Sequence, residues 1–538
     1  MIRPVASLTL LTLIACVVCQ DAVSIGESAD AAVSGTPVIA VWDAVPYQMI
    51  DKPFQVGVVA FHETGCRVDF TVLQPADAAG TSHDSVKWGE SVAQATFNKR
   101  TGAWEYYITV DPGKLDDGPF AVQAEAVPLG EGHLSTRLKE LPLYANSGGT
   151  LGPRAPVWAD CTVGDDESGD GTEAKPLETI RQALKVAGDG GTVYLKAGKD
   201  YSAQSLGGGK RHAYWTTIAA APGVERDDVE IGSGRTGTDK LRFHRVTLYS
   251  DPPTRAYNTI LSGENGSTIV WLDDCKMYNR KGRWEGGGVV FGNRYVGYVT
   301  GGITTEMDNG PAGVLVRNHK ISRITSDALT GARTAINVEV RGIDRGPTSA
   351  HPDWHQSYTG GGDKYKTCIL YNCSGFDCLS QGFFGHNLKD SAFVNCIFHR
   401  PPGVGYSQYS GHMDHVFWLH CTVPMQTWLW RGTLHGDNCF VVNGIFIKMQ
   451  ESQGGNTDGF TISHNHFIDQ REPMGTEATT GDPQFVDPGQ LDYHVQPSSP
   501  AARSGLPLQC VPADIDGHPR DPRHPTRGCY ACPESPEK

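Results

Sequence analysis

The sequence has no apolar run after its N-terminal segment that is long enough to span a bilayer, and it has fewer basic than acidic residues. Lys and Arg number 46 and Asp and Glu number 60, so the formal net charge is −14. A negative surplus disfavours nucleic acid and anionic membranes as partners, because both are negatively charged themselves. We therefore expect no nucleic-acid partner, and contact with a membrane only through the N-terminus.

Length and glycine are what the chain has in abundance. At 538 residues it exceeds what one compact domain usually holds, so two or more domains are expected. It contains 64 glycines, while 39% of its residues are apolar and 20% are charged. This composition is typical of a β-rich globular protein, and we predict an all-β fold.

Residues 1–19 predict a signal peptide. A short basic start at Arg3 precedes the apolar run VASLTLLTLIA, which is too short to span a membrane. Residues 13–16, LIAC, also resemble the lipobox of bacterial lipoproteins, which implies lipidation of Cys16. Plain secretion with cleavage near Cys19 is the alternative. Either way the protein is expected to be exported, as a secreted, periplasmic or lipid-anchored cell-surface protein.

The cysteines outside this segment fall into groups. Cys373, Cys396 and Cys421 recur 23 and 25 residues apart, each before a β-type segment. We predict that they stack as reduced, buried side chains inside the fold. Export permits disulfides, and the best candidates, whose pairing stays open, are Cys510, Cys529 and Cys532.

A repeat of 22 to 31 residues extends beyond the cysteines. Its marker positions are Asn318, Arg341, Asn372, Asn395, His420, Asn443 and Asn465. Short runs of β-forming residues flank each marker, which is the pattern that a parallel β-helix requires, because each coil packs on the coils above and below it. We expect the asparagines to form a hydrogen-bonded ladder. An ordinary β-sandwich with coincident spacing is the alternative.

Two stretches carry a family resemblance. Residues 159–198, from ADCTVGDDESGDG to TVYLKAG, and residues 481–505, from GDPQFVDPG to PAARSG, resemble the entry and the close of right-handed parallel β-helix proteins of the pectin-lyase-like superfamily. The resemblance covers roughly residues 155–530 and implies a right-handed parallel β-helix over 158–530. It implies no single activity, because the superfamily includes lyases, hydrolases, epimerases, esterases and adhesive spikes.

The entry stretch predicts a short helix that covers the first coil. Pro176 suits a first helical turn, and Leu177, Ile180, Leu184 and Ala187 fall on one helical face. Such a cap protects strand edges that would otherwise aggregate. A calcium loop, or more simply a solvated acidic turn, is predicted at Asp165, Asp166 and Asp170.

Residues 36–148 follow a different pattern. Strand-like segments with alternating apolar residues, separated by turns, predict a small two-sheet β-sandwich. It resembles the immunoglobulin-like modules that accompany secreted enzymes. Residues 149–157 are expected to be a linker. The sandwich contains no catalytic constellation, so we expect it to act as a spacer or in binding.

The segment SAHPDWHQSYTGGG, residues 349–362, lies inside the longest repeat step. Insertions at the turns of a β-helix are suited to function, because the strands form a rigid scaffold. Asp327, Asp353 and Asp377 recur at steps of 26 and 24, so we expect them to stack on successive coils. Carboxylates about 4.8 Å apart repel one another, and they respond by sharing a proton, binding a cation or raising a pKa. Calcium on this column is a possible cofactor.

Two cleavage chemistries fit these residues. An inverting glycoside hydrolase needs its acid and base about 6.5 to 9.5 Å apart, close to a two-coil separation of Asp327 and Asp377. A polysaccharide lyase needs a cation or an arginine to neutralise a uronate, and a base to remove a proton. The candidate catalytic residues are Asp353, His355, Asp327, Asp377, His351 and Tyr358. The candidate substrate-binding residues are Trp354, Arg345, Lys364, Lys366, Tyr406, Trp428, Trp430 and Arg431.

A scaffold interpretation is the alternative for the same residues. Aspartates at coil corners often accept backbone N–H groups, and His355 can be an interior histidine while Trp354 points outward. The sequence thus predicts an exported, carbohydrate-cleaving enzyme, either a lyase or an inverting hydrolase, with an extended polysaccharide as its partner. The alternatives are a non-catalytic carbohydrate-binding protein and a cell-surface adhesin or structural protein. No complete motif of a lyase family, no certain cofactor and no oligomeric state can be identified.

Overall fold

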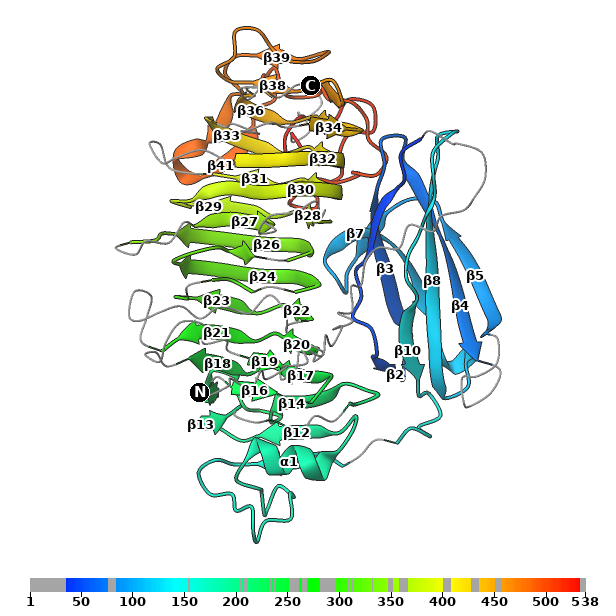
Figure 1. Ribbon diagram of the computed structural model, residues 1–538, viewed down its shortest axis with the longest axis vertical. Helices are drawn as coiled ribbons and strands as arrows, with labels where there is room; N and C mark the ends of the chain where they lie inside the picture. Colours follow the sequence, from blue (N-terminus) through cyan, green and yellow to red (C-terminus); the bar gives the residue numbers. More distant parts are fainter. Residues whose placement is uncertain are drawn as a thin grey trace, which may run out of the picture.

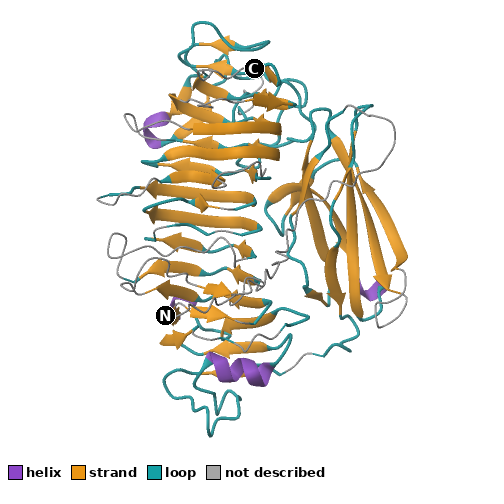
Figure 2. Ribbon diagram, viewed as in Figure 1, coloured by secondary structure: helices purple, strands orange, loops and turns teal. Residues whose placement is uncertain are grey.

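The computed structural model describes residues 35–75, 84–152, 155–203, 206, 211–232, 234–236, 238–250, 261–263, 269–280, 297–307, 309–311, 313–330, 332–346, 352–357, 366–399, 408–426, 435–449 and 457–532. It is a right-handed parallel β-helix preceded by a small β-sandwich, as predicted (Figure 1). Strands dominate both parts (Figure 2). Within the described residues no helix combines the length and apolarity needed to cross a bilayer. The signal peptide and lipobox lie outside the described residues.

Two antiparallel sheets form the sandwich. One has the order β1-β3-β7-β6, and the other runs β2-β10-β8-β4-β5 with β9 beside β8. Their facing sides share an apolar core that includes Val58, Phe70 and Val122. The strands are β1 Ile39–Trp42, β2 Met49–Ile50, β3 Phe54–Phe61, β4 Cys66–Pro75, β5 Asp84–Val92, β6 Thr96–Asn98, β7 Ala103–Val110, β8 Gly118–Pro128, β9 Thr136–Arg137 and β10 Leu141–Ala145. Their likeness to an immunoglobulin module stays a prediction.

The β-helix stacks its strands in three parallel ladders. The first ladder contains β11 Val157–Ala159, β12 Thr192–Leu195, β14 Thr216–Ala220, β17 Leu241–His244, β20 Val270–Asp273, β22 Tyr298–Thr300, β28 Ile369–Tyr371, β35 Cys439–Val442 and β37 Phe460–Ser463. The second contains β13 Gly198–Ser202, β15 Val229–Gly232, β18 Thr247–Ser250, β21 Lys276–Asn279, β23 Ile303–Thr305, β29 Ser374–Phe376, β31 Ile397–Phe398, β33 Thr422–Gln426, β36 Ile445–Lys448, β38 His466–Phe467 and β39 Thr479–Thr480.

The third ladder and four long strands complete the coils. The third ladder contains β25 Leu329–Thr330, β27 Asp353–Ser357 and β34 His435–Asp437, and a separate parallel pair is β16 Gly234–Thr236 with β19 Leu261–Gly263. The long strands, which turn coil corners, are β24 Leu315–Ile324, β26 Thr334–Ile343, β30 Gln381–Val394 and β32 Gln408–Leu419. A final hairpin is β40 Phe485–Asp487 with β41 Asp492–Val495. The short 3-10 helices are Pro112–Lys114, Arg226–Asp228 and Pro488–Gln490.

The corner between the first two ladders explains the sequence repeat. Its residues have φ between +50° and +59°, a region that Asn, Asp and His tolerate better than most residues do. They are Arg245, Asp274, Asn318, Asn337, Asn372, Asn395, His420, Asn443 and His464. An amide ladder joins four of them, with Nδ2 to Oδ1 distances of 2.9, 3.2 and 3.1 Å from Asn318 through Asn337 and Asn372 to Asn395. The predicted ladder is therefore confirmed for Asn318, Asn372 and Asn395.

Two markers of the repeat were assigned to the wrong position. Arg341 pairs with Ser322 in the second ladder, and the corner residue of its coil is Asn337. Asn465 follows the corner residue His464. The coil from Asn318 to Asn337 therefore advances by 19 residues and the next, to Asn372, by 35, so the coil that carries residues 349–362 has a larger insertion than predicted.

The cysteine column is confirmed. Cys373, Cys396 and Cys421 directly follow corner residues, are buried and are free thiols. Each Sγ donates to a carbonyl of the preceding coil, at 3.3 to 3.4 Å. A small apolar side chain that can donate weakly fits this interior position. The expectation of C-terminal disulfides was wrong: the three cysteines there, Cys510, Cys529 and Cys532, are also free thiols.

The first coil is covered as expected, by α1, Ile180–Ala187. Thr179 is its N-cap, and its buried face consists of Ile180, Ala183, Leu184 and Ala187. Pro176 lies before the helix and not in its first turn. The acidic residues before it form a turn, because their carboxylates accept nearby backbone N–H groups: Asp165, Asp166 and Asp170.

The sandwich docks lengthwise on the first ladder (Figure 1). Phe61 packs edge-on against Tyr371, with ring centroids 5.3 Å apart, in an apolar cluster that both parts build. Polar contacts flank it: Trp215 Nε1 donates to Pro46 O at 2.6 Å, and Arg317 forms a buried ion pair with Asp43. The two parts therefore form one continuous body.

Candidate functional site

The third ladder places two of the predicted carboxylates on neighbouring coils. Leu329 is in register with His355, so Asp327 and Asp353 stand one above the other. The Asp353 N–H donates to Asp327 Oδ1 at 3.0 Å, and the Asp327 N–H donates to Asn309 Oδ1 at 3.0 Å. This part of the predicted column is confirmed. The side chains of Asn309 and Asp327 thus each order the backbone of the next coil, as the scaffold interpretation expects.

Burial changes the chemistry of this pair. Asp353 is 0% exposed and Asp327 is 8% exposed. Burial, and then the charge of Asp327, raise the pKa of Asp353 to about 8. Asp353 is therefore protonated at neutral pH beside a second carboxyl group. General acid–base chemistry needs two carboxyl groups with different pKa values, so that one can donate a proton while the other accepts one.

His355 is an interior histidine. It is fully buried, and its Nε2 lies 3.1 Å from Cys368 Sγ while its ring meets Phe393 edge-on at 6.4 Å. Burial lowers the pKa of His355 to about 4, so the ring is neutral at physiological pH. These contacts support the scaffold interpretation for this residue.

Trp354 was predicted to point outward, but it lies fully inside the coil. Its ring centroid is 5.5 Å from that of Phe398. Gly375 makes the room, because a Cβ atom there would stand 2.7 Å from Trp354 Nε1. A buried indole offers no stacking surface to a sugar, so Trp354 stabilises the core.

Asp377 does not belong to the carboxylate column. Asp353 is in register with Gln381, and Asp377 instead follows β29 at an exposed corner with φ of +54°. Burial, and then the charge of Asp377, raise the pKa of Tyr493 to about 12. The predicted two-coil pair of Asp327 and Asp377 is therefore not formed, whereas calcium binding at the remaining pair of Asp327 and Asp353 stays a prediction.

The remaining predicted residues are divided. Arg345 is exposed near the insertion, and Lys366 is partly buried in the coil of His355, where burial lowers the pKa of its ammonium group. The others lie outside the described residues: His351, Tyr358, Lys364, Tyr406, Trp428, Trp430 and Arg431.

A groove that the sequence did not predict lies where the sandwich, the second ladder and the C-terminal segment meet. Its volume is about 470 Å³. Its aromatic and charged lining consists of Phe97, Trp104, Glu339, Arg341, Phe376, Asp516 and Tyr530. The guanidinium of Arg341 lies 5.1 Å over the ring of Phe376 and is paired with Glu339. This groove could not be predicted from the sequence, because three distant segments build it and Arg341 meets Phe376 only through the strand register of the second ladder.

A positive charge is held at the edge of this groove. His494 lies between Asp492 and Asp516, 2.7 and 3.1 Å away, and its ring is 4.1 Å from that of Tyr530. The hydrogen bond to Asp516 is the main cause that raises the pKa of His494 to about 9, so the ring is protonated at neutral pH. The groove therefore combines aromatic surface with charges of both signs.

No protein-family model and no curated protein sequence matches the chain. Solved structures similar to it include a GH136 lacto-N-biosidase from Eubacterium ramulus, at 10% identity and a TM-score of 0.31, over 58% of this chain and 68% of that one. XylC in complex with xylose matches at 10% identity and a TM-score of 0.37, over 70% of this chain and 98% of that one. A rhamnogalacturonan lyase matches at 13% identity and a TM-score of 0.30, over 62% of this chain and 91% of that one. At these scores the likenesses carry no argument about activity, and the fold rests on the strand pairing.

Proposed function

We propose that this protein binds an extended polysaccharide across the second ladder, in the groove beside Arg341. The observation that carries the proposal is the lining of that groove. Phe97, 44% exposed, and Trp104 offer ring faces to the apolar side of a sugar, while Arg341 and Glu339 offer hydrogen bonds to hydroxyl or carboxylate groups. The partly exposed polar side chains of Ser322 and Thr305 continue the face on lower coils.

Cleavage of that polysaccharide is the second candidate. It is supported by one observation, the raised pKa of Asp353 beside Asp327, because a carboxyl group that is protonated at neutral pH can act as a general acid. The chemistry stays open between an inverting hydrolase and a lyase. Against it stands the burial of Asp353 and His355, which favours binding without cleavage.

Binding is tested with acidic and neutral polysaccharides by affinity electrophoresis. Arg341→Ala and Phe97→Ala should each weaken binding at least about tenfold, through lost hydrogen bonds and lost stacking surface. Arg67→Ala is the matched control, because Arg67 is a partly exposed arginine on the sandwich sheet that contains β4 and does not line the groove. Unchanged affinity in both groove variants would contradict the proposal.

Cleavage is followed in the same samples through reducing ends and the absorbance of unsaturated uronates. If the parent protein cleaves, Asp353→Asn should lower turnover by about 10² to 10⁴ with little change in affinity. An Asp353→Asn protein that cleaves at the parent rate would exclude the pair from catalysis.

A further inference from the structure

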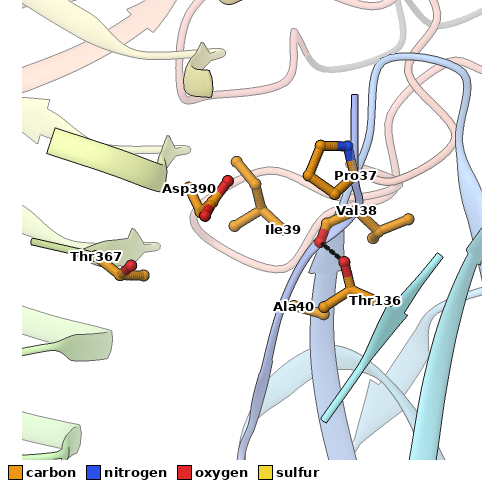
Figure 3. Close-up of a pocket in the computed structure, with 7 residues that line it drawn as sticks. All are labelled: Pro37, Val38, Ile39, Ala40, Thr136, Thr367 and Asp390. Atoms are coloured by element: carbon orange, nitrogen blue, oxygen red, sulfur yellow. Dashed lines mark hydrogen bonds between the residues drawn. The ribbon is translucent and has the colours of Figure 1, made fainter. Parts of the chain in front are cut away.

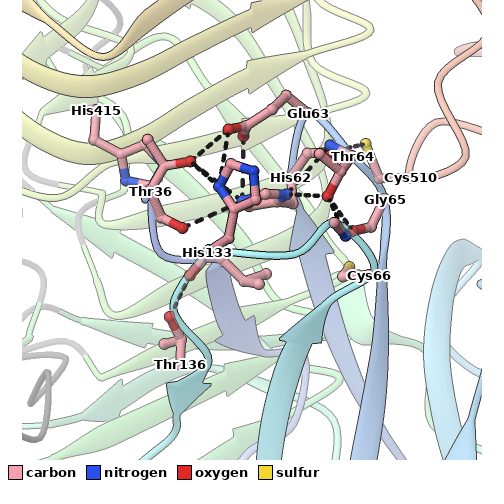
Figure 4. A network of polar contacts seen from close by, with 12 residues as sticks. Thr36, His62, Glu63, Thr64, Gly65, Cys66, His133, Thr136, His415 and Cys510 are labelled. Carbon is pink, nitrogen blue, oxygen red and sulfur yellow. Dashed lines mark hydrogen bonds and ion pairs between the residues drawn. The ribbon is translucent and has the colours of Figure 1, made fainter. Parts of the chain in front are cut away.

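Three side chains with metal-binding atoms meet at the end of the sandwich that faces the β-helix (Figure 4). His62 and Glu63 directly follow β3, and His133 lies in the connection from β8 to β9. A parallel bridge between Pro37 and Leu134 fixes the segment that carries Thr36 beside His133. Segments far apart in the sequence thus converge on one point.

The separations of the donor atoms fit a single ion. His62 Nε2 lies 3.3 Å from Glu63 Oε2, and His133 Nδ1 lies 3.6 Å from Glu63 Oε1. Ligands about 2.0 to 2.1 Å from a tetrahedral zinc ion are about 3.3 Å from one another. The Thr36 hydroxyl contacts all three side chains, so it would have to turn aside for a zinc ion to enter.

The carboxylate of Glu63 is a second observation that points to a bound cation. Its Oε2 atom is buried and has no hydrogen-bond partner within the described part of the chain. A buried carboxylate oxygen without a hydrogen bond is costly, because it has lost its water. A cation between Glu63 and the two imidazoles would satisfy it.

The β-helix contributes a third imidazole, and a fourth candidate ligand, near this cluster. His415, on β32, is 2% exposed, and its Nδ1 lies 2.8 Å from Asp390 Oδ1. Its Nε2 is buried, with no hydrogen-bond partner among the described residues. A carboxylate on one ring nitrogen, leaving the other free to bind, is the support that metal-binding histidines usually have. Figure 4 draws His415 together with the residues of the cluster.

We propose that His62, Glu63 and His133 bind a zinc ion together with His415, and that this ion fastens the sandwich to the β-helix. Imidazole and carboxylate are ligands that zinc accepts. The site is structural and not catalytic, because four protein ligands complete a tetrahedral shell and leave no open position for a substrate. A separate cavity of about 10 Å³, large enough for one water molecule, lies between Ile39, Thr136 and Asp390 (Figure 3). The proposal does not depend on polysaccharide binding.

The full-length protein is treated with chelator, dialysed and titrated with Zn²⁺. We expect one zinc ion per chain by elemental analysis, a higher melting temperature with zinc, and a tetrahedral absorption spectrum with Co²⁺. His133→Ala, on a partly exposed turn, and Glu63→Gln should each weaken zinc binding more than about tenfold. His524→Ala is the control, because His524 is exposed and remote from the cluster in sequence.

His415→Ala separates the two halves of the proposal. It should weaken zinc binding at least about tenfold and remove the increase in melting temperature. If this variant binds zinc as tightly as the parent, the proposal that the ion attaches the sandwich to the β-helix is wrong. A parent protein that binds no zinc, or a His133→Ala variant that binds as tightly as the parent, would overturn the site itself and leave a network of hydrogen bonds.

Discussion

Asp353 illustrates how burial sets the state of one side chain. Its pKa is about 8 in the folded protein and close to 4 in an unfolded chain, so between these values the folded state binds the extra proton. Stability from this group is therefore present at low pH and is lost as the pH rises from about 4 to about 8, by up to ~1.4 kcal/mol per pH unit. Neutral asparagine has no proton to lose.

We predict that the free energy of unfolding of Asp353→Asn depends less on pH than that of the parent. Above pH 8 the variant should be more stable than the parent. Urea unfolding of both proteins at several pH values between 5 and 9 measures this. Asp69→Asn is the control, because it makes the same substitution at a side chain that is 39% exposed on the sandwich and not buried. Parallel curves for parent and Asp353→Asn would show that Asp353 is ionised throughout.

At the scale of the element, the corner ladder combines backbone conformation with side-chain bonding. Asn372 has φ of +53°, donates to Asn337 and accepts from Asn395. Asn372→Gly keeps the conformation and loses only the amide bonds, at about 1 to 2 kcal/mol. Asn372→Ala also loses the tolerance for positive φ, which adds about 1 to 2 kcal/mol. Chemical unfolding should rank the parent above glycine and glycine above alanine; equal glycine and alanine variants would contradict this.

The same corner explains how far the sequence could predict the fold. Asn372, Asn395 and the cysteines after them carry a local signal, because only a few residue types suit a positive φ followed by a buried position. Arg341 was misassigned because the spacing of 23 residues fitted a repeat that is locally 19 and then 35. Periodicity shows that coils exist but does not reveal an insertion between them.

The candidate site was predictable only where its contacts are local in the repeat. The spacing correctly predicted Asp327 above Asp353. The prediction for Asp377 was wrong, because the residue in register with Asp353 on the next coil is Gln381, four residues further along the chain. Trp354 was placed outside because alternation was assumed, and Gly375 on another ladder makes the interior space for it. The groove and the histidine cluster need three chain segments each, which no spacing within one segment reveals.

At the scale of the whole molecule, a buried ion pair joins the two parts. Asp43 is 0% exposed and pairs with Arg317 of β24. Removing one partner leaves a buried charge uncompensated, so Asp43→Ala should lower the free energy of unfolding by about 3 to 5 kcal/mol. Asp69→Ala, which breaks an exposed pair with Arg67, should cost less than ~1 kcal/mol. Denaturation midpoints compare the two, and equal losses would show that the interface charge is solvated.

The lengthwise docking of the sandwich has a consequence for how the β-helix comes apart. In a stack of coils each coil contacts only its neighbours, so the ends can fray one coil at a time. Here one sandwich contacts first-ladder side chains from Trp215 to Val442, which couples coils that never touch one another. The sandwich therefore holds these coils together along the stack. Amide hydrogen exchange along the first ladder should proceed as one cooperative unit, and the coils at either end that the sandwich does not contact should be the first to exchange.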